Sequence, residues 1–176
     1  MKMKYNDFEQ DLRREQDKGK QEHIQEFYEV YFKNYEAHAV EYDESYGKYL
    51  QHAGVDRVLT YKGTPFKQYW VQEKVIFSDY PNFLFEYEKK SGAEGWAISD
   101  SEKADYLLYY MNGTFYIFHF ESLRKWLKDN LKLFIHKYRK DTDNKNLMIP
   151  INTVIRELNR EYTSVIEVNK ELERVN

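Results

Sequence analysis

The segment ADYLLYYMNGTFYIFHF, residues 104–120, constrains the fold more than any other part of the chain. Asn112-Gly113 separates two runs that are rich in aromatic residues. This dipeptide favours a two-residue turn, because both central residues of a type I′ turn need a positive φ. The segment therefore predicts a β-hairpin, and with it a β-sheet in the core.

The remaining elements follow from hydrophobic periodicity and from turn residues. Helices are predicted over residues 6 to about 46, 121–140 and 152–176, the last with Asn152 as its N-cap. Strands are predicted over residues 54–63, 66–77, 82–90 and 147–151, with loops over residues 91–104 and 140–146. This order predicts an α/β or α+β fold, with a mixed β-sheet flanked by helices.

The length of 176 residues predicts a single domain over residues 1–176, large enough to bury a core. Residues 1–50 would be an N-terminal helical segment, residues 51–155 a mixed-sheet core with its helix, and residues 152–176 a C-terminal helix. The chain has 17 Tyr and 11 Phe, so large rings are expected to supply much of the core.

Composition excludes several classes of site. The chain has no cysteine, which excludes disulfides, thiolate zinc sites and cysteine nucleophiles. Its formal net charge of -3 gives no overall basic character, so any nucleic-acid surface must be a local patch. The first residues are polar and of both signs, and no apolar run reaches membrane length. A cytoplasmic protein without a membrane partner is expected.

Common catalytic and metal-binding motifs do not match. The run from Asp141 resembles the start of an EF-hand loop, but it has Asn146 at the sixth position and Asn152 at the twelfth. The five histidines lack paired zinc spacing. We find no Gly-rich phosphate loop, nucleophile elbow or dinucleotide fingerprint.

Residues 54–77 carry polar side chains where buried strands usually carry none: Asp56, Gln72 and Lys74. Residues two apart in a strand share a face, so Gln72 and Lys74 point one way and Glu73 the other. If the two strands pair as a hairpin around Lys62-Gly63, Asp56 lies near the Gln72 face. A carboxylate, a second oxygen ligand and a lysine would then meet, a set suited to magnesium-assisted phosphodiester hydrolysis.

These residues resemble the signature of a nuclease superfamily. GVDRVL…WVQEKV is similar to the Asp…(Glu/Gln)-x-Lys motif of PD-(D/E)XK nucleases in its Gln-x-Lys variant, and KGKQEHI to their helix-borne Gly-x-x-Glu. GWAISDSEKADYLLYYMNGTFYIF resembles the Gly-Trp…Ala-Asp-Tyr segment of small bacterial and phage members. NFLFEYEKK falls where the third core strand is expected, with Glu86 as a candidate accessory acid. The resemblance covers about residues 15 to 155 and implies a restriction-endonuclease-like three-layer core.

The resemblance implies a metal-dependent nuclease that hydrolyses DNA with Mg²⁺ or Mn²⁺. Asp56 would be the main metal ligand and Gln72 the second, the main-chain carbonyl of Glu73 would complete the site, and Lys74 would be the catalytic lysine. Glu22 would orient a water or bind a second metal. The chain departs from the family in two ways: Gln72 replaces an acid, and the helix after the third strand is shortened to residues 101–104.

Each candidate also has an interpretation without catalysis. Gln72 and Lys74 would suit the solvent face of an edge strand. Asp56 could cap a turn or form an ion pair. Glu73 could be a surface residue or an ion-pair partner, and Glu22 could belong to a solvated helix face.

Aromatic and basic residues outside this set have two readings as well. Trp96 fits either core packing or stacking on a base of a single-stranded substrate. A basic cluster fits either phosphate contact or a solvated helix face; its members are Arg124, Lys125, Lys128, Lys132, Lys137, Arg139 and Lys140.

Two functions other than cleavage remain open. The chain could be a catalytically inactive nuclease-fold protein that acts as a nucleic-acid-binding or regulatory module. It could also be an unrelated interaction module with a tyrosine-rich surface, in which case Asp56, Gln72 and Lys74 would not converge. The sequence leaves open the form of the nucleic acid, the sequence specificity and a homodimer.

Overall fold

The computed structural model describes residues 18–41, 45–76, 81–111, 113–141, 143–158 and 163–167. The chain divides into two compact units, residues 1–38 with 59–68 and residues 39–58 with 69–176, and we describe each unit by itself. Residues 6–17 of the first predicted helix lie outside the described residues. The single domain over residues 1–176 stays a prediction.

The first unit contains one helix and parts of two neighbouring strands. Its elements are α2 (Lys18–Tyr31), β1 (Tyr35–Ala39) and the last residues of β2 (Arg57–Tyr61). The helix predicted from residue 6 to about 46 is confirmed over α2 and wrong over β1. β1 and β2 are neighbours in a sheet, with the ring centroids of Tyr35 and Tyr61 5.4 Å apart. Packing between the strands here outweighs the helical preference of Glu and Ala.

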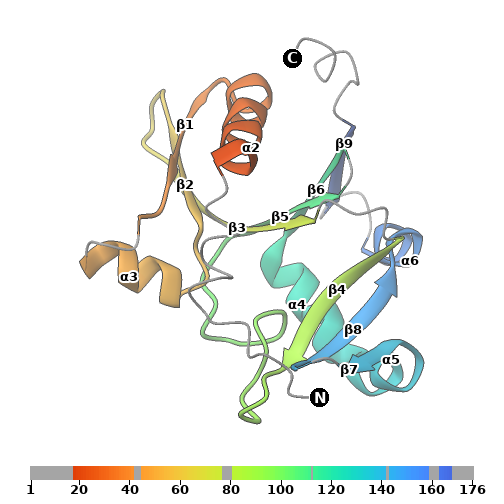
Figure 1. The fold of residues 1–176 in the computed structure, drawn as a ribbon. Helices are drawn as coiled ribbons and strands as arrows, with labels where there is room; N and C mark the ends of the chain where they lie inside the picture. The colour runs from red at the N-terminus through yellow and green to blue at the C-terminus, as the bar shows by residue number, and fades with distance from the viewer. Residues whose placement is uncertain are drawn as a thin grey trace. The chain divides into compact units, whose positions relative to one another are not determined.

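The second unit holds a mixed β-sheet. Its strands β3 (Gln68–Ile76), β5 (Tyr106–Met111), β6 (Thr114–His119) and β9 (Thr163–Glu167) are neighbours in this order (Figure 1). β3 and β5 are parallel, whereas β5 pairs with β6 and β6 with β9 in antiparallel fashion. The predicted mixed sheet, and with it the α/β or α+β class, is confirmed.

The hairpin predicted around Asn112-Gly113 is also confirmed. Met111 pairs with Thr114 across the turn. Gly113 has a φ of +81°, the left-handed conformation that this turn needs. Asn112 itself lies outside the described residues.

A separate three-stranded antiparallel sheet lies in the same unit. Its strands, in spatial order, are β4 (Asn82–Glu88), β8 (Lys145–Pro150) and β7 (Arg139–Asp141). The strands predicted over residues 82–90 and 147–151 are therefore confirmed. The expected place of β4 as third strand of the core sheet is wrong, because β4 pairs with β8 and turns Phe83, Phe85 and Tyr87 towards a core.

The helix predicted over residues 121–140 is two helices, α4 (Phe120–Asp129) and α5 (Leu131–Tyr138). The break falls at Asn130, which has a ψ of 6°. Its Nδ2 donates a hydrogen bond to the carbonyl of Trp126 at 2.9 Å. Asn side chains compete in this way for the hydrogen bonds of a helical backbone, which favours a helix end.

The C-terminal helix predicted over residues 152–176 is wrong beyond its first turns. α6 (Ile151–Glu157) follows β8 directly, so Asn152 lies inside the helix and Pro150 is at the N-cap position. Residues 163–167 form β9 instead, where three of the five residues are β-branched and favour a strand. Residues 168–176 lie outside the described part.

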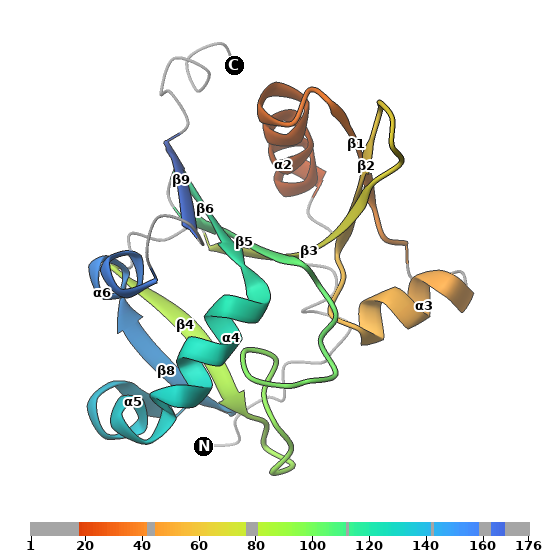
Figure 2. The same ribbon diagram turned by 180° about the vertical axis from the view of Figure 1, so that it is seen from behind.

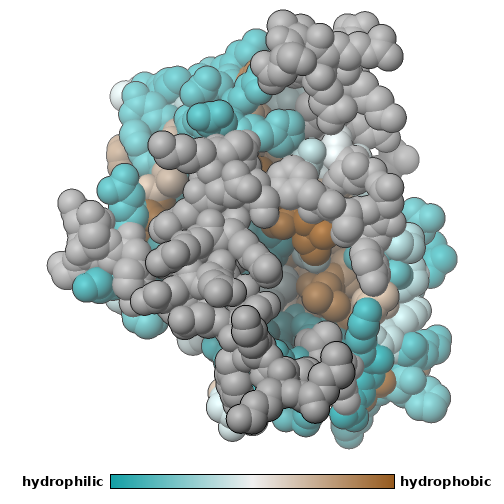
Figure 3. Space-filling view, in the orientation of Figure 1, coloured by the Kyte–Doolittle hydropathy of each residue, from teal (hydrophilic) through white to brown (hydrophobic). Residues whose placement is uncertain are grey.

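Aromatic rings fill the main core of the second unit, as predicted. The ring of Phe83 on β4 lies edge-on to Tyr109 at 4.8 Å and to Phe118 at 5.3 Å, so it joins the two sheets. α4 lies on one face of β4 and β8 (Figures 1 and 2). Its buried side chains are Phe120, Leu123 and Leu127. Figure 3 shows hydrophobic residues near the middle of the face it draws and mostly hydrophilic residues towards its edges.

The strands β2 and β3 form the hairpin that was predicted around Lys62-Gly63. The amide of Asp56 donates to the carbonyl of Val71 at 2.9 Å, and the amide of Tyr61 donates to the carbonyl of Lys67 at 2.9 Å. β3 therefore has a hydrogen-bonded neighbour on each side, β5 being the other. The reading of Gln72 and Lys74 as residues of an edge strand is wrong.

A buried ion pair crosses this hairpin. Arg57 Nε donates to Glu73 Oε1 at 2.7 Å, and the two side chains are only 2% and 8% exposed. Water cannot solvate either charge at that depth, so each charge depends on the other for its compensation.

We expect Arg57→Met and Glu73→Met each to lower the free energy of unfolding by about 3–5 kcal/mol, since each breaks a buried ion pair by removing one of its two charges. The double variant should lose much less than the sum, because neither charge remains. Urea denaturation followed by tryptophan fluorescence measures this.

The matched control is Lys125→Met, which breaks the exposed pair of Lys125 with Asp129 on α4 and should cost about 0.5 kcal/mol or less. A loss for Arg57→Met no larger than for this control would contradict the structural role of the buried pair.

Candidate active site

The carboxylate of Asp56 is fixed against the middle of β3. Asp56 immediately precedes β2, and its Oδ2 accepts a hydrogen bond from the backbone N–H of Glu73 at 2.6 Å. A charge-assisted bond of this kind is short and strong. The structure therefore brings Asp56 beside the three-residue segment Gln72–Lys74.

The two faces of this segment differ in chemistry. The Glu73 side chain points to Arg57 and is an ion-pair partner. Gln72 and Lys74 belong to the other face because side chains alternate along a strand. Gln72 is buried, at 5% exposure, and its Oε1 has no hydrogen-bond partner among the described residues. An amide oxygen in that condition is unfavourable unless something else binds it.

Lys74 combines a charged end with an aromatic neighbour. Its Nζ lies 5.0 Å from the ring centroid of Trp96, within the range of a cation–π contact. Trp96 itself packs on Phe85 and Phe120, with ring centroids 6.1 and 6.3 Å away. These contacts favour core packing for Trp96 over base stacking.

The sequence analysis missed one acid, Glu102. It lies in the loop before β5, is only 7% exposed, and its Oε2 has no hydrogen-bond partner among the described residues. Burial raises the pKa of this carboxyl above its ordinary value of 4.5, while the positive charge of Lys74 acts to lower it. In the sequence it stands in the polar run SDSEK, where nothing distinguishes it from a surface residue.

Gly54 provides the space that Glu102 occupies. A Cβ at Gly54 would lie 1.5 Å from Glu102 Oε2 and 3.5 Å from Gln72 Nε2. The ends of Glu102 and Gln72 are thus neighbours over the same glycine. Gly54 also has a φ of +71°, which disfavours any side chain there.

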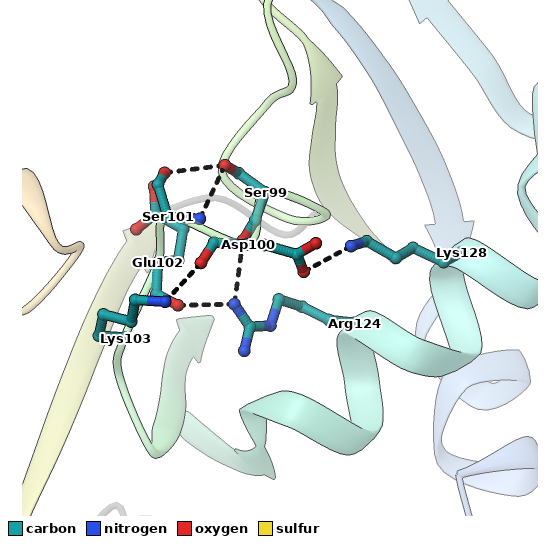
Figure 4. Close-up of polar contacts among 7 residues, drawn as sticks. All are labelled: Ser99, Asp100, Ser101, Glu102, Lys103, Arg124 and Lys128. Carbon is teal, nitrogen blue, oxygen red and sulfur yellow. Dashed lines mark hydrogen bonds and ion pairs between the residues drawn. The ribbon is translucent and has the colours of Figure 1, made fainter.

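Backbone contacts hold the loop that carries Glu102 (Figure 4). Arg124 of α4 donates to the carbonyls of Ser99 at 2.9 Å and Glu102 at 2.6 Å. The amide of Lys103 donates to the carbonyl of Ala53 at 2.7 Å. Neither contact uses the Glu102 carboxylate. The predicted helical remnant at residues 101–104 is wrong, because this stretch is turn and extended chain.

The basic cluster is partly occupied by internal contacts. Besides Arg124, Lys128 pairs with Asp100 at 2.6 Å and Lys125 with Asp129 at 2.6 Å. For these three members a structural role accounts for the charge. For Lys132, Lys137, Arg139 and Lys140, phosphate contact stays a prediction.

The other two candidate acids lie elsewhere. Glu22 is an exposed residue of α2, in the first unit, and its role in the site stays a prediction. Glu86 lies on β4, where its carboxylate accepts a hydrogen bond from the side chain of Asn144. The charge of Glu86 also acts to raise the pKa of Glu102.

The donor set suits a hard, hydrated cation better than a fully enclosed one. The described residues contain no group of three His, Cys, Asp or Glu side chains arranged to hold a metal. They do offer two buried oxygens without partners among the described residues, Gln72 Oε1 and Glu102 Oε2, on side chains whose ends both approach the Cβ position of Gly54. Mg²⁺ takes oxygen ligands, keeps several waters and needs only one or two carboxylates. The residues therefore fit the group that the sequence motif implies.

Comparison with protein-family models, with curated proteins and with solved structures finds no match to this chain. Within the described residues, every helix is too short or too polar to cross a membrane.

We expect the free energy of unfolding of the metal-free protein to depend on Glu102 through pH. The folded state binds the Glu102 proton more tightly than the unfolded state does, because burial raises the folded pKa. Stability should therefore fall as pH rises from about 4.5 through the folded pKa. Glu102→Gln should remove this slope and be the more stable protein at neutral pH. Urea denaturation at a series of pH values in EDTA, with Glu121→Gln as the exposed control, tests this; equal slopes in all three proteins would contradict it.

Gly54→Ala should destabilise the protein more than Gly92→Ala. Both glycines have a positive φ, and an alanine there costs about 1–2 kcal/mol. Gly92 has nothing within 4 Å of an added Cβ, whereas Gly54 has the Glu102 carboxylate. The extra cost of Gly54→Ala should vanish in a Glu102→Ala background, as a double-mutant cycle by urea denaturation would measure. Persistence of the extra cost there would show that the carboxylate does not fill this space.

Proposed function

We propose that this protein is a metal-dependent nuclease that hydrolyses phosphodiester bonds of DNA in the cytoplasm. The observation that carries the proposal is the hydrogen bond from the Glu73 N–H to Asp56 Oδ2. It fixes a carboxylate beside residues 72–74 of β3. In this segment Glu73 pairs with Arg57 on one face of the strand, and Gln72 and Lys74 lie on the other face.

The proposed work of the oxygens is to hold a divalent cation, Mg²⁺ or Mn²⁺. Asp56, Gln72 Oε1 and the main-chain carbonyl of Glu73 are the proposed ligands. When bound, such a cation lowers the pKa of a water and stabilises the negative charge that develops on phosphorus. Gln72 Oε1 is buried and has no hydrogen-bond partner among the residues that the structure describes, which supports its part in this set.

The proposed work of Lys74 is to orient the attacking water and to offset negative charge in the transition state. Its position supports this. The Trp96 ring lies beneath its ammonium group, and β3 is held on both sides by neighbouring strands, so the amine belongs to a rigid element. A group held in one geometry loses little freedom when the reaction begins.

The test is a cleavage assay with plasmid, linear, branched and single-stranded DNA, and with RNA, in Mg²⁺ and then in Mn²⁺. Wild-type protein should produce cleavage in at least one combination. Asp56→Asn keeps an oxygen that can accept the Glu73 N–H, and Lys74→Met keeps the stem over Trp96, so both should fold. Each should lower the rate by about 100-fold or more.

The controls are Asp129→Asn and Lys125→Met, an exposed acid and an exposed lysine that pair with each other on α4. Both should cleave like the wild type. Full cleavage by purified Lys74→Met would overturn the assignment. Binding of nucleic acid with no product on any substrate in either metal would instead favour the inactive nuclease-fold module, in keeping with an amide at position 72.

A further inference from the structure

Gln72 leaves the proposed site short of one negative charge. Asp56 is the sole carboxylate among the ligands Asp56, Gln72 Oε1 and the Glu73 carbonyl. An amide oxygen is a neutral ligand, so it contributes less than a carboxylate to the binding of a divalent cation. A second carboxylate near Gln72 would restore the balance.

Glu102 is a carboxylate in that position. Both Gln72 and Glu102 are more than nine-tenths buried, and each has an oxygen without a hydrogen-bond partner among the described residues. The two side-chain ends meet over Gly54. Glu102 approaches the Cβ position of Gly54 with Oε2 and Gln72 approaches it with its amide nitrogen, so the amide and the carboxylate group are close together. A cation bound by both side chains would satisfy Gln72 Oε1 and Glu102 Oε2, which lack partners among the described residues.

The contacts that hold the Glu102 loop do not involve the Glu102 carboxylate. Arg124 and Ala53 hold the backbone of the loop on either side, and Gly54 leaves room for the side chain. The side chain is thus held in a fixed buried position while its oxygen stays unused. Functional ligands need such support from neighbouring residues to keep their geometry.

We infer that Glu102 supplies the carboxylate that is absent at position 72, and that with Gln72 Oε1 it binds a hydrated divalent cation beside Lys74. The class of ligand is a hard cation such as Mg²⁺ or Mn²⁺. The role of this cation in catalysis rests on the proposed nuclease function, whereas its binding does not.

The test measures Mn²⁺ binding directly, by the loss of the free-ion signal in electron paramagnetic resonance, on the full chain with MnCl₂ as probe. Wild-type protein should bind Mn²⁺, and Glu102→Gln should bind it at least ~10-fold more weakly, because even the loss of groups that only support a ligand costs 10–100-fold. Glu102→Asp should keep part of the affinity, because the carboxylate remains. Glu121→Gln, an exposed acid on α4, should bind like the wild type.

The outcomes separate the two proposals. Unchanged Mn²⁺ binding in folded Glu102→Gln, or no binding by the wild type, would overturn the inference even if DNA is cleaved. Binding that depends on Glu102, without cleavage of any substrate, would support the inference and overturn the nuclease. Circular dichroism and thermal melting of each variant separate lost binding from lost folding. If only Glu102→Gln fails to fold, the Mn²⁺ affinity of Glu102→Asp tests the inference instead.

Discussion

Arg57 and Glu73 face each other across neighbouring strands, with both charges almost out of contact with solvent. This pair fixes which face of β3 each side chain takes, because a shift of one residue would bury Gln72 or Lys74 against the arginine and leave two charges uncompensated. Once Glu73 points to Arg57, Gln72 and Lys74 must point the other way. The same register brings the Glu73 N–H to Asp56. One ion pair thus orders all four polar residues of the candidate site.

The site carries a cost in stability. The oxygens of Gln72 and Glu102 that lack a partner in the described part of the chain each cost about 1–3 kcal/mol, which an apolar core would avoid. A glycine with a positive φ and an arginine hydrogen-bonded to two loop carbonyls hold this arrangement in place. Proteins keep such unfavourable groups chiefly at functional sites, where a ligand offsets the cost. The cluster over Gly54 has this character, and the basic residues of α4 that pair with neighbouring acids do not.

Strong local patterns allowed much of the fold to be predicted. Asn112-Gly113 predicted its hairpin correctly, and alternation along residues 66–77 and 82–90 predicted β3 and β4. β1 was missed because its Glu and Ala residues favour a helix, and its strand state comes from pairing with β2. β9 was missed because residues 152–176 were assigned to one continuous helix despite the three β-branched residues of this strand. The strand that pairs with β4 could not be predicted either. Alternating apolar residues show that one face of a strand is buried, but they do not show which sheet the strand joins. That Gln72 and Lys74 share a face could be predicted, because side chains two residues apart in a strand point the same way. Glu102 could not be predicted as a site residue, because its burial depends on a glycine 48 positions earlier and an arginine 22 positions later.

The parallel pairing of β3 with β5 encloses a long connection, and this connection contains both β4 and the Glu102 loop. Contacts between residues far apart in sequence form slowly, because the chain must first give up the entropy of closing a large loop. Gly54, Gln72, Glu102 and Arg124 come from four separate segments, so their meeting requires β3, the loop before β5 and α4 to be in place. We therefore expect the cluster to form late as the chain folds. In a partly folded chain the four residues are not yet brought together. Cation binding would therefore report that folding is complete.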